Sequence, residues 1–384
     1  MGRTAGTDGL DPVKSRLNHL ARQISAPWLR WTLGLGLGGL LLWLAAKEVN
    51  LGDVGTVLAQ ADPGWVSAAL VSVLLSLVLR SLRWQILLAP GRPHTPPLPH
   101  SLLLPSLFVG QLLNALAPTR LGDLSRAYVV GREGLSRSFV LGTVVVEKLF
   151  DAVAYGLLLL LLLALTPLPD WAKPAAISFV AITGALFVVL ALAGLSRGRL
   201  LDWLTVVRLP WLPQLLVQGV ARRLEAGLVS LDVLQSRATV AQLLAWSLLI
   251  WITGALTNYL LFPALGLDLP PAAALLLLVV LQISVTLPPS PGNMGIFEGI
   301  CIFTLAIFGV DRTTGLSYGL LLHAVVFLPT VIGGLISLGR LGLWGQKFDA
   351  APRLPESIET MIASEAVLAR EWNTSEEDEA WKDL

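Results

Sequence analysis

The sequence has 384 residues, of which 54% are hydrophobic and only 14% charged, and its formal net charge is +1. This composition is typical of a helical membrane protein with several spans and excludes a soluble domain with a large core. The single cysteine excludes an internal disulfide, and the four histidines are scattered without ligand spacing. We therefore expect no metal and no other cofactor, and we expect no nucleic acid partner.

Apolar runs in the sequence predict an all-α polytopic membrane protein. Two further apolar stretches are interrupted, so we expect about six full spans and two re-entrant broken hairpins; eight full spans are the alternative. The six uninterrupted runs cover residues 31–46, 65–88, 139–165, 175–195, 240–265 and 315–338.

Charge divides the chain into three parts: a basic arm (1–30), a transmembrane domain (31–345) and an acidic tail (346–384). The positive-inside bias places both termini in the cytoplasm of a multi-pass protein of the cell (inner) membrane. The tail is expected to be solvated and to contribute solubility or a protein contact.

An arginine-rich loop follows the fourth run and contains apolar residues at steps of three and four. This pattern predicts an amphipathic helix on the inner leaflet. Its apolar positions are Val217, Val220, Leu224, Leu228, Leu231 and Leu234.

The first interrupted stretch begins with an apolar run, 101–117, that meets Pro118 and Gly122 while still in hydrocarbon. Arg92 precedes this run and four arginines, beginning with Arg120, follow it. A normal crossing would carry the later arginines outside, against the positive-inside bias. We therefore predict a re-entrant hairpin that enters from the cytoplasm; a full span that violates the bias is the alternative.

The second interrupted stretch covers residues 270–309, in which the segment LPPSPGNMG separates two short apolar runs. Gly292, Asn293 and Gly295 cannot continue a helix, and the helix that restarts after them would aim free N–H groups at an anion. Glu298 then either caps this helix or pairs with an arginine. A hairpin from each face suggests an inverted repeat with a site near the midplane.

Glu147 and Asp151 lie one turn apart on an apolar helix, so they share a face and resist joint ionisation. Three alternatives remain open: arginines neutralise both carboxylates, one carboxylate carries a proton, or Glu147 lies at the water interface. The arginines that could neutralise them are Arg80, Arg83, Arg120 and Arg126.

The arginines divide into two groups by context. Arg83 and Arg132 are expected to be ordinary flanking charges with snorkelling stems. Arg120 and Arg126 stand beside the Pro/Gly break, where guanidinium groups match phosphate bidentately.

Three motifs occur in the order NxxxPxRxGDxxR (114–126), EKxxD (147–151) and PxSPGNxGxxE (288–298). Together they resemble the lysylphosphatidylglycerol synthase transmembrane region, or flippase-like, family over about residues 30–345. The resemblance implies an integral membrane protein that moves or handles a phosphate-bearing lipid. The chain departs from the family pattern at Lys148, where an arginine is common.

The residues and the resemblance together give two predicted sets. The substrate-binding set is Asn114, Arg120, Asp123, Arg126, Gly292, Asn293 and Gly295. The proton or charge network is Arg80, Glu147, Asp151 and Glu298.

We therefore expect a lipid flippase or transporter, not an enzyme, whose polar intramembrane cavity takes the anionic headgroup of a phospholipid or polyprenyl phosphate. The sequence lacks a P-loop, which excludes ATP as the direct energy source. One alternative is a membrane glycosyltransferase that uses Asp53 and Asp62. The other is a non-catalytic partner of a glycosyltransferase or envelope-synthesis enzyme, docked through the acidic tail.

Overall fold

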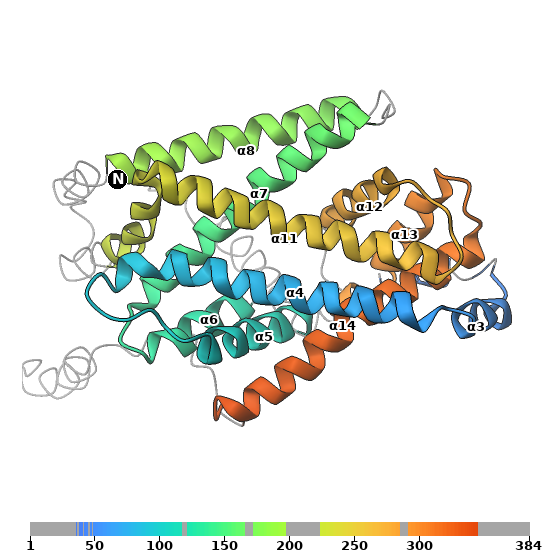
Figure 1. The fold of residues 1–384 in the computed structure, drawn as a ribbon, viewed down its shortest axis with the longest axis horizontal. Coiled ribbons are helices and arrows are strands. Elements are labelled where there is room, and N and C mark those ends of the chain that lie inside the picture. The colour runs from blue at the N-terminus through green and yellow to red at the C-terminus, as the bar shows by residue number, and fades with distance from the viewer. Residues whose placement is uncertain are drawn as a thin grey trace, which may run out of the picture. The chain divides into compact units, whose positions relative to one another are not determined.

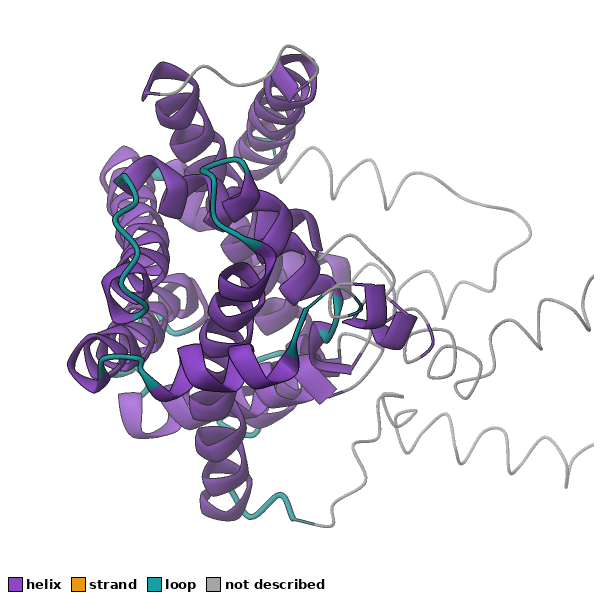
Figure 2. Cartoon of the chain, turned by 90° about the vertical axis from the view of Figure 1, so that its right-hand side faces the viewer, coloured by secondary structure: helices purple, strands orange, loops and turns teal. Residues whose placement is uncertain are grey.

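The computed structural model describes residues 49–116, 121–165, 172–196, 223–284 and 291–344, with part of 36–47. Every regular element in these residues is a helix, which confirms the all-α class for this part of the chain (Figure 2). The elements are α3 (Leu51–Ala59), α4 (Pro63–Leu88), η1 (Ala89–Gly91), α5 (His100–Leu116), α6 (Leu121–Gly131), α7 (Arg137–Leu165), α8 (Ala172–Leu195), η2 (Val229–Gln235), α11 (Arg237–Ala264), α12 (Pro271–Ser284), η3 (Pro291–Asn293), α13 (Ile296–Ala306) and α14 (Arg312–Arg340).

Among the described helices, α4, α11 and α14 are long and apolar enough to cross a membrane. Helices α7 and α8 have 29 and 24 residues. These five helices coincide with the second to sixth predicted spans, and the first span is described only in part. The number of crossings stays a prediction.

Helices α4 and α11 form a long antiparallel pair (Figure 1). The backbone N–H of Asp62, before α4, donates to the carbonyl oxygen of Ala264, at the end of α11, at 2.8 Å. Further along, Ser72 Oγ donates to the carbonyl oxygen of Thr253 at 2.9 Å, and Thr257 Oγ1 lies 3.0 Å from Ser72 Oγ. Small hydroxyl side chains thus hold the two helices together, as is common between membrane helices.

Helices α5 and α6 form the first helical hairpin. Their backbones nearly touch, because a Cβ on Gly122 would lie 1.8 Å from the carbonyl oxygen of Gly110. At the open end, Arg92 Nη1 lies 3.5 Å from the carbonyl oxygen of Glu133, so the chain enters and leaves at the same end of α4. The 11 residues of α6 rise about 16 Å, roughly half of a 30 Å hydrocarbon core.

Helices α12 and α13 form the second hairpin, which opens at the other end of the α4–α11 pair. There Phe308 and Val310 pack in one apolar cluster with Leu265 and Leu267, which follow α11. Segment η3, just after the tip of this hairpin, contacts α5 of the first hairpin. The two tips themselves, 117–120 and 285–290, lie outside the described residues.

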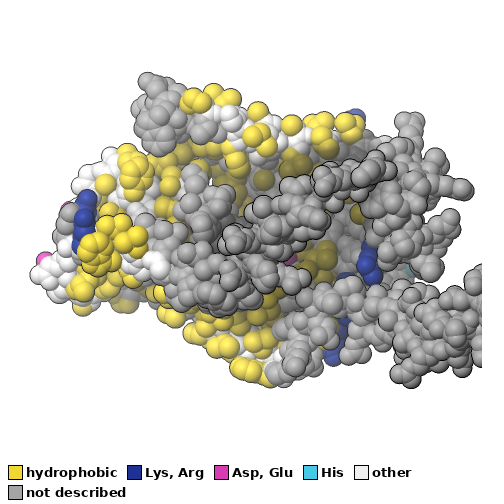
Figure 3. Space-filling model, turned by 180° about the vertical axis from the view of Figure 1, so that it is seen from behind, with side chains coloured by type: hydrophobic (Ala, Val, Ile, Leu, Met, Phe, Trp, Pro, Cys, Tyr) yellow, Lys and Arg dark blue, Asp and Glu magenta, His cyan; other side chains and the backbone are white. Residues whose placement is uncertain are grey.

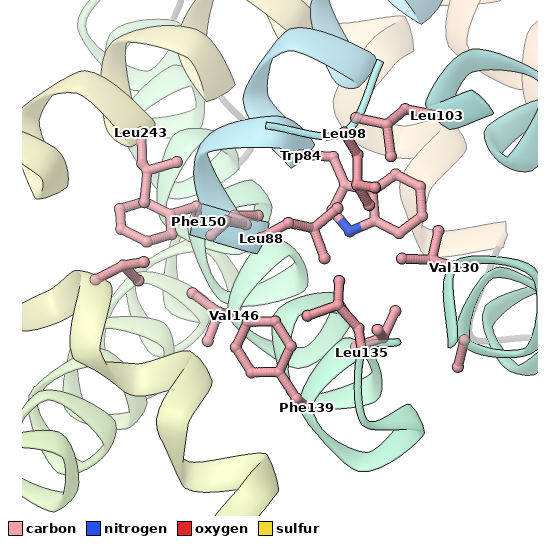
Figure 4. Close-up of a cluster of buried hydrophobic side chains, with 14 of the residues drawn as sticks. Trp84, Leu88, Leu98, Leu103, Val130, Leu135, Phe139, Val146, Phe150 and Leu243 are labelled. Atoms are coloured by element: carbon pink, nitrogen blue, oxygen red, sulfur yellow. The ribbon is translucent and has the colours of Figure 1, made fainter. Parts of the chain in front are cut away.

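An apolar core joins α4, α5, α6, α7 and α11 (Figure 4). Trp84 is fully buried at its centre, and its indole N–H donates to Thr143 Oγ1 at 3.2 Å. Phe139 and Phe150 of α7 and Leu243 of α11 pack in the same cluster. This core fixes the part of α4 that carries the neighbouring Arg83.

The prediction of an amphipathic helix on the inner leaflet is wrong for residues 229–235, whereas Leu224 of the same stripe is exposed. Residues 223–228 are helical and continue into η2, where Leu231 and Leu234 are buried in the protein core. The stripe turns inward because Gly142 and Gly194 have no side chain and let η2 approach α7 and α8 closely. Residues 197–222 lie outside the described part.

The two ends of the bundle differ in charge. Arg92, Arg132 and Arg237 lie at the end where α4 finishes and α11 begins. Asp62 and Asp268 lie at the other end, with α3. Hydrophobic side chains cover much of the visible surface between the ends, while most visible basic side chains lie towards the ends (Figure 3). This distribution is typical of a protein surrounded by lipid.

Candidate functional site: a buried arginine–carboxylate cluster

Arg83 joins both carboxylates of α7. Its side chain is fully buried, with Nη1 2.5 Å from Asp151 Oδ1 and Nη2 3.2 Å from Glu147 Oε1. The prediction that Arg83 is an ordinary flanking charge is therefore wrong. A planar guanidinium can reach two carboxylates at once, which an ammonium group cannot do with the same geometry.

Two more arginines flank this centre. Arg126 Nη2 lies 2.6 Å from Glu147 Oε2, and its guanidinium carbon is 4.1 Å from the ring centre of Trp84. Arg80 Nη1 lies 3.8 Å from Asp151 Oδ2, and its guanidinium stacks on Trp251 at 4.8 Å. The side chain of Arg80 is 19% exposed, so it forms the accessible edge of the cluster.

Helix α11 supplies two polar contacts that the sequence did not reveal. Ser247 Oγ accepts from Arg83 Nη1 at 2.7 Å, and Trp251 Nε1 donates to Asp151 Oδ1 at 3.0 Å. Both residues sit in an apolar run without a motif. The only indication in the sequence is that this run contains several hydroxyl and indole side chains, as does the run at 65–88.

These contacts decide between the three alternatives for the carboxylates. Glu147 is 3% exposed, which excludes a position at the water interface. Arginines neutralise both Glu147 and Asp151, so neither needs a proton to be buried. The structure thus favours a buried ion network.

Among the described residues, three arginines face two carboxylates, which gives the cluster one positive charge in excess. It also has polar atoms left over: within the described residues, Arg83 Nε, Arg126 Nε and Tyr155 Oη are buried without a hydrogen-bond partner. The Tyr155 ring stacks on Trp251 at 4.2 Å, which places it beside Arg80. Buried donors without an acceptor are rare and call for an explanation.

Only part of the predicted substrate-binding set reaches this cluster. Arg126 belongs to it. Asn114 is exposed, and its Oδ1 accepts from the backbone N–H of Gly122 at 2.8 Å, which fixes the two arms of the first hairpin. Asp123 is half-buried in the first turn of α6. Arg120 lies outside the described residues.

The second hairpin breaks where the motif predicts. Gly292, Asn293 and Gly295 have positive φ angles of 65°, 57° and 82°, and α13 starts directly afterwards. Gly295 has no room for a side chain, because a Cβ would lie 2.0 Å from the carbonyl oxygen of Gly38.

Glu298 takes the capping role and is not joined to the α7 carboxylates. Its Oε2 accepts from the backbone N–H of Gly295 at 2.6 Å, and its Oε1 lies 2.6 Å from His323 Nδ1. Within the described residues its side-chain partner is thus His323, not an arginine. His323 was missed because a lone histidine in an apolar run carries no spacing signal.

The described side chains of the cluster contact one another, and the polar cavity stays a prediction because residues 117–120 lie outside the described part. A cavity of about 240 Å³ lies beyond the cluster, at the end of α4 beside the following linker. Its lining residues are Gln85, Leu88, Ala89, Arg92, Thr95, Pro97 and Leu98.

Comparison with known proteins gives a family match over residues 31–334, to the family described as Lysylphosphatidylglycerol synthase TM region. Among curated proteins, the chain is 28% identical over 337 residues to Glycosyltransferase AglD of Haloferax volcanii, covering 79% of this chain and 53% of AglD. It is 26% identical over 284 residues to a UPF0104 membrane protein of Methanothermobacter thermautotrophicus, covering 68% of this chain and 81% of that protein. A UPF0104 membrane protein of Methanocaldococcus jannaschii is 25% identical over 225 residues, 58% of this chain and 92% of that protein.

These relatives overturn one expectation. The sequence argument excluded an enzyme, but AglD is named a glycosyltransferase and the matching family is named after a synthase. The expectation that the chain is not an enzyme was therefore wrong as an exclusion, because it followed only from the expected role as a lipid transporter. The match spans about half the length of AglD.

Proposed function

The chain belongs to the Lysylphosphatidylglycerol synthase TM region family, and on this premise we propose that it binds the headgroup of a phosphate-bearing membrane lipid at the arginine–carboxylate cluster and carries it between leaflets. The lipid is a phospholipid or a polyprenyl phosphate, whose hydrocarbon chains stay in the bilayer. The observation that supports this most directly is the excess of one positive charge in a buried site.

Charge and hydrogen bonding both favour a phosphate ligand. A buried cluster with a surplus cation is destabilised unless an anion balances it. Phosphate oxygens would also accept from the donors that lack partners, Arg83 Nε, Arg126 Nε and Tyr155 Oη. One anionic headgroup would therefore satisfy the charge and the donors together.

The two hairpins supply a route for movement. They open at opposite ends of the α4–α11 pair, and α5 contacts η3 near the second tip. We place both hairpins in the membrane as re-entrant elements, since irregular backbone at that depth lies within protein or beside water. A headgroup would enter beside one hairpin and leave beside the other, as in transporters with inverted halves.

The test is binding of lipid to purified protein in nanodiscs, read by native mass spectrometry. We expect anionic phospholipid to be retained over zwitterionic lipid, and Arg80→Gln to weaken retention by about tenfold, or about 1.4 kcal/mol. Arg80 is chosen because its 3.8 Å contact leaves the shorter Arg83 pairs in place. Arg132→Gln, which changes an exposed arginine, is the matched control. Equal retention of both lipid classes by the unmodified protein would contradict the proposal.

Movement is tested separately in proteoliposomes that contain a fluorescent anionic phospholipid. After dithionite has reduced the outer-leaflet probe, we expect further loss of fluorescence with the unmodified protein, because inner-leaflet lipid then reaches the outside. A loss equal to that of protein-free vesicles would refute transport. If the protein binds lipid but does not move it, the proposed headgroup site is supported and only the proposed transport is refuted.

A second candidate is glycosyl transfer to or from a lipid phosphate, favoured by the similarity to AglD. Asp53 is exposed in the first turn of α3, whereas Asp62 caps α4 by accepting from Gly64 N at 2.7 Å. Only Asp53 is thus free of a capping role. Incubation with polyprenyl phosphate and nucleotide sugars should then yield a glycolipid that Asp53→Asn abolishes, while lipid binding is unchanged.

Two expectations about the surroundings remain proposals. The basic end of the bundle faces the cytoplasm of the cell membrane, which would place both termini there. The acidic tail, 346–384, would dock on a glycosyltransferase or envelope-synthesis enzyme; this segment lies outside the described residues. Deletion of the tail should then release the partner and leave lipid binding intact.

A further inference from the structure

A second charged pair lies outside the arginine–carboxylate cluster, where the second hairpin meets α14. Glu298 Oε1 lies 2.6 Å from His323 Nδ1, and the other carboxylate oxygen caps α13 through the N–H of Gly295. Glu298 is buried, and the His323 side chain is 12% exposed. A separation of 2.6 Å is that of a charge-assisted hydrogen bond.

The described residues around His323 contact its two ring nitrogens differently. Nδ1 faces the carboxylate, which fixes the proton on that nitrogen when the ring is neutral. Nε2 points towards the break in the hairpin, 3.8 Å from the position of a Cβ on Gly292. Phe297 and Phe327 hold the ring from two sides, at centroid distances of 4.8 and 5.5 Å.

We infer that Glu298 and His323 form a proton-binding site, in which His323 Nε2 takes up one proton and the net charge of the pair changes from −1 to zero. Resting on the proposed function, we further infer that this proton is coupled to lipid binding. The pair joins α13 to α14, and α14 packs on α5 of the first hairpin, so its charge state acts on the contact between both hairpins.

Among the described residues, this pair is better suited to carry a proton than the charges around it. The carboxylates of α7 are neutralised by arginines, which keep their protons. The titratable groups beside the pair are Cys301, on the next turn of α13, and Tyr318 of α14, whose hydroxyl donates to the carbonyl oxygen of Asn258. Neither changes charge near neutral pH in a buried site, whereas histidine does.

The charged groups on the other packed helices are engaged elsewhere. Arg80 and Arg83 of α4 pair with Asp151, and His100 of α5 contacts Ser81 at 3.0 Å. Asp53 lies on the exposed face of α3. Helix α12 carries no titratable residue.

Proton binding is measured directly by NMR of protein labelled at histidine in nanodiscs, with the His323 signal assigned by its loss in His323→Gln. We expect this signal to change between about pH 5 and 8 and its midpoint to differ in Glu298→Gln, which removes the carboxylate that Nδ1 contacts. A His323 signal that does not change over this range, or the same midpoint in Glu298→Gln, would overturn the site.

Coupling is measured on the same protein as retention of anionic phospholipid against pH. One linked proton changes the binding constant by up to about tenfold per pH unit. We expect His323→Gln to remove this dependence and His100→Gln, the matched control, to keep it. The same pH dependence in His323→Gln as in the unmodified protein would refute coupling. If no anionic lipid binds at any pH, the proposed function fails, and the NMR titration still decides whether the pair binds a proton.

Discussion

At the scale of single residues, Arg83 makes more polar contacts within the cluster than Arg80 or Arg126 does. It donates to Asp151 and Ser247 and pairs with Glu147, with no exposed surface. Its loss would leave two buried carboxylates one turn apart with only Arg80 and Arg126 at their outer sides. Like charges in low dielectric then repel each other, and one must take up a proton.

We predict that Arg83→Met destabilises the protein by about 3–5 kcal/mol, the cost of leaving a buried charge without its partner. Thermal unfolding in detergent, followed by circular dichroism, measures the effect. Arg132→Met is the control, because Arg132 is exposed and should change the free energy of unfolding by less than about 0.5 kcal/mol. Similar melting temperatures for both variants would show that the network is not needed for the fold.

Sequence reasoning named the three arginines of this cluster among the possible partners of the carboxylates, but it favoured a flanking position for Arg83. The spacing of Glu147 and Asp151 predicts a shared helix face, and Arg126 stands out beside a helix break. Arg83 was misplaced because flanking arginines near a span end have the same local pattern whether they face solvent or a carboxylate. Pairing across helices depends on their rotation about their axes, which one sequence does not determine.

At the scale of elements, the first hairpin depends on two glycines that face each other. Gly122→Ala would place a Cβ 1.8 Å from the carbonyl oxygen of Gly110, which belongs to the backbone of α5 and cannot rotate away, and 2.7 Å from Asn114 Oδ1. We predict that α5 and α6 separate at this point and that the protein loses about 1–3 kcal/mol, as overpacked sites do. Thermal unfolding measures this loss.

Gly184→Ala is the matched control for the hairpin glycine, since it lies within α8 and its Cβ would meet nothing within 4 Å. Alanine favours a helix over glycine by about 1 kcal/mol, so this variant should be neutral or slightly stabilised. Equal melting temperatures for the Gly122 and Gly184 variants would contradict the close approach of α5 and α6.

The elements themselves were the most predictable part of the fold. Apolar runs gave five helices close to their observed bounds, and the proline and glycine residues of the PGNMG segment gave the break before α13. The prediction from the apolar stripe at 217–234 was wrong for η2, because an apolar helix face can pack equally well against lipid or against a protein core. Gly142 of α7 and Gly194 of α8 make room for η2 in the core, and the stripe itself gives no indication of these residues on other helices.

At the scale of the whole molecule, the arrangement of the hairpins predicts which residues share a side of the membrane. In a Cys301→Ser background, single cysteines replacing Arg92 and Arg132 should react with an impermeant maleimide from one side. Cysteines replacing Asp268 and Asp311 should react from the other side, because a re-entrant hairpin returns to the face from which it enters. Cys301 is buried, so its replacement removes background labelling without opening the surface.

If each hairpin were instead a full span, the two positions that flank it would lie on opposite sides of the membrane. The cysteine at position 92 would then react from the side opposite to that at position 132, and the same would hold for positions 268 and 311. Sequence reasoning could reach this arrangement only through the bias of arginines. The meeting of α5 with η3 in the middle of the molecule follows from tertiary packing and could not be read from either hairpin alone.

The hydroxyl contacts between α4 and α11 have a consequence for motion. Ser72, Thr253 and Thr257 join α4 to α11 by hydrogen bonds near the middle of both helices. We therefore predict that α4 and α11 move as one unit and that the hairpins move relative to this pair. Spin labels on α4 and α11 should keep one sharp separation when anionic lipid is added, while labels on α6 and α13 change theirs.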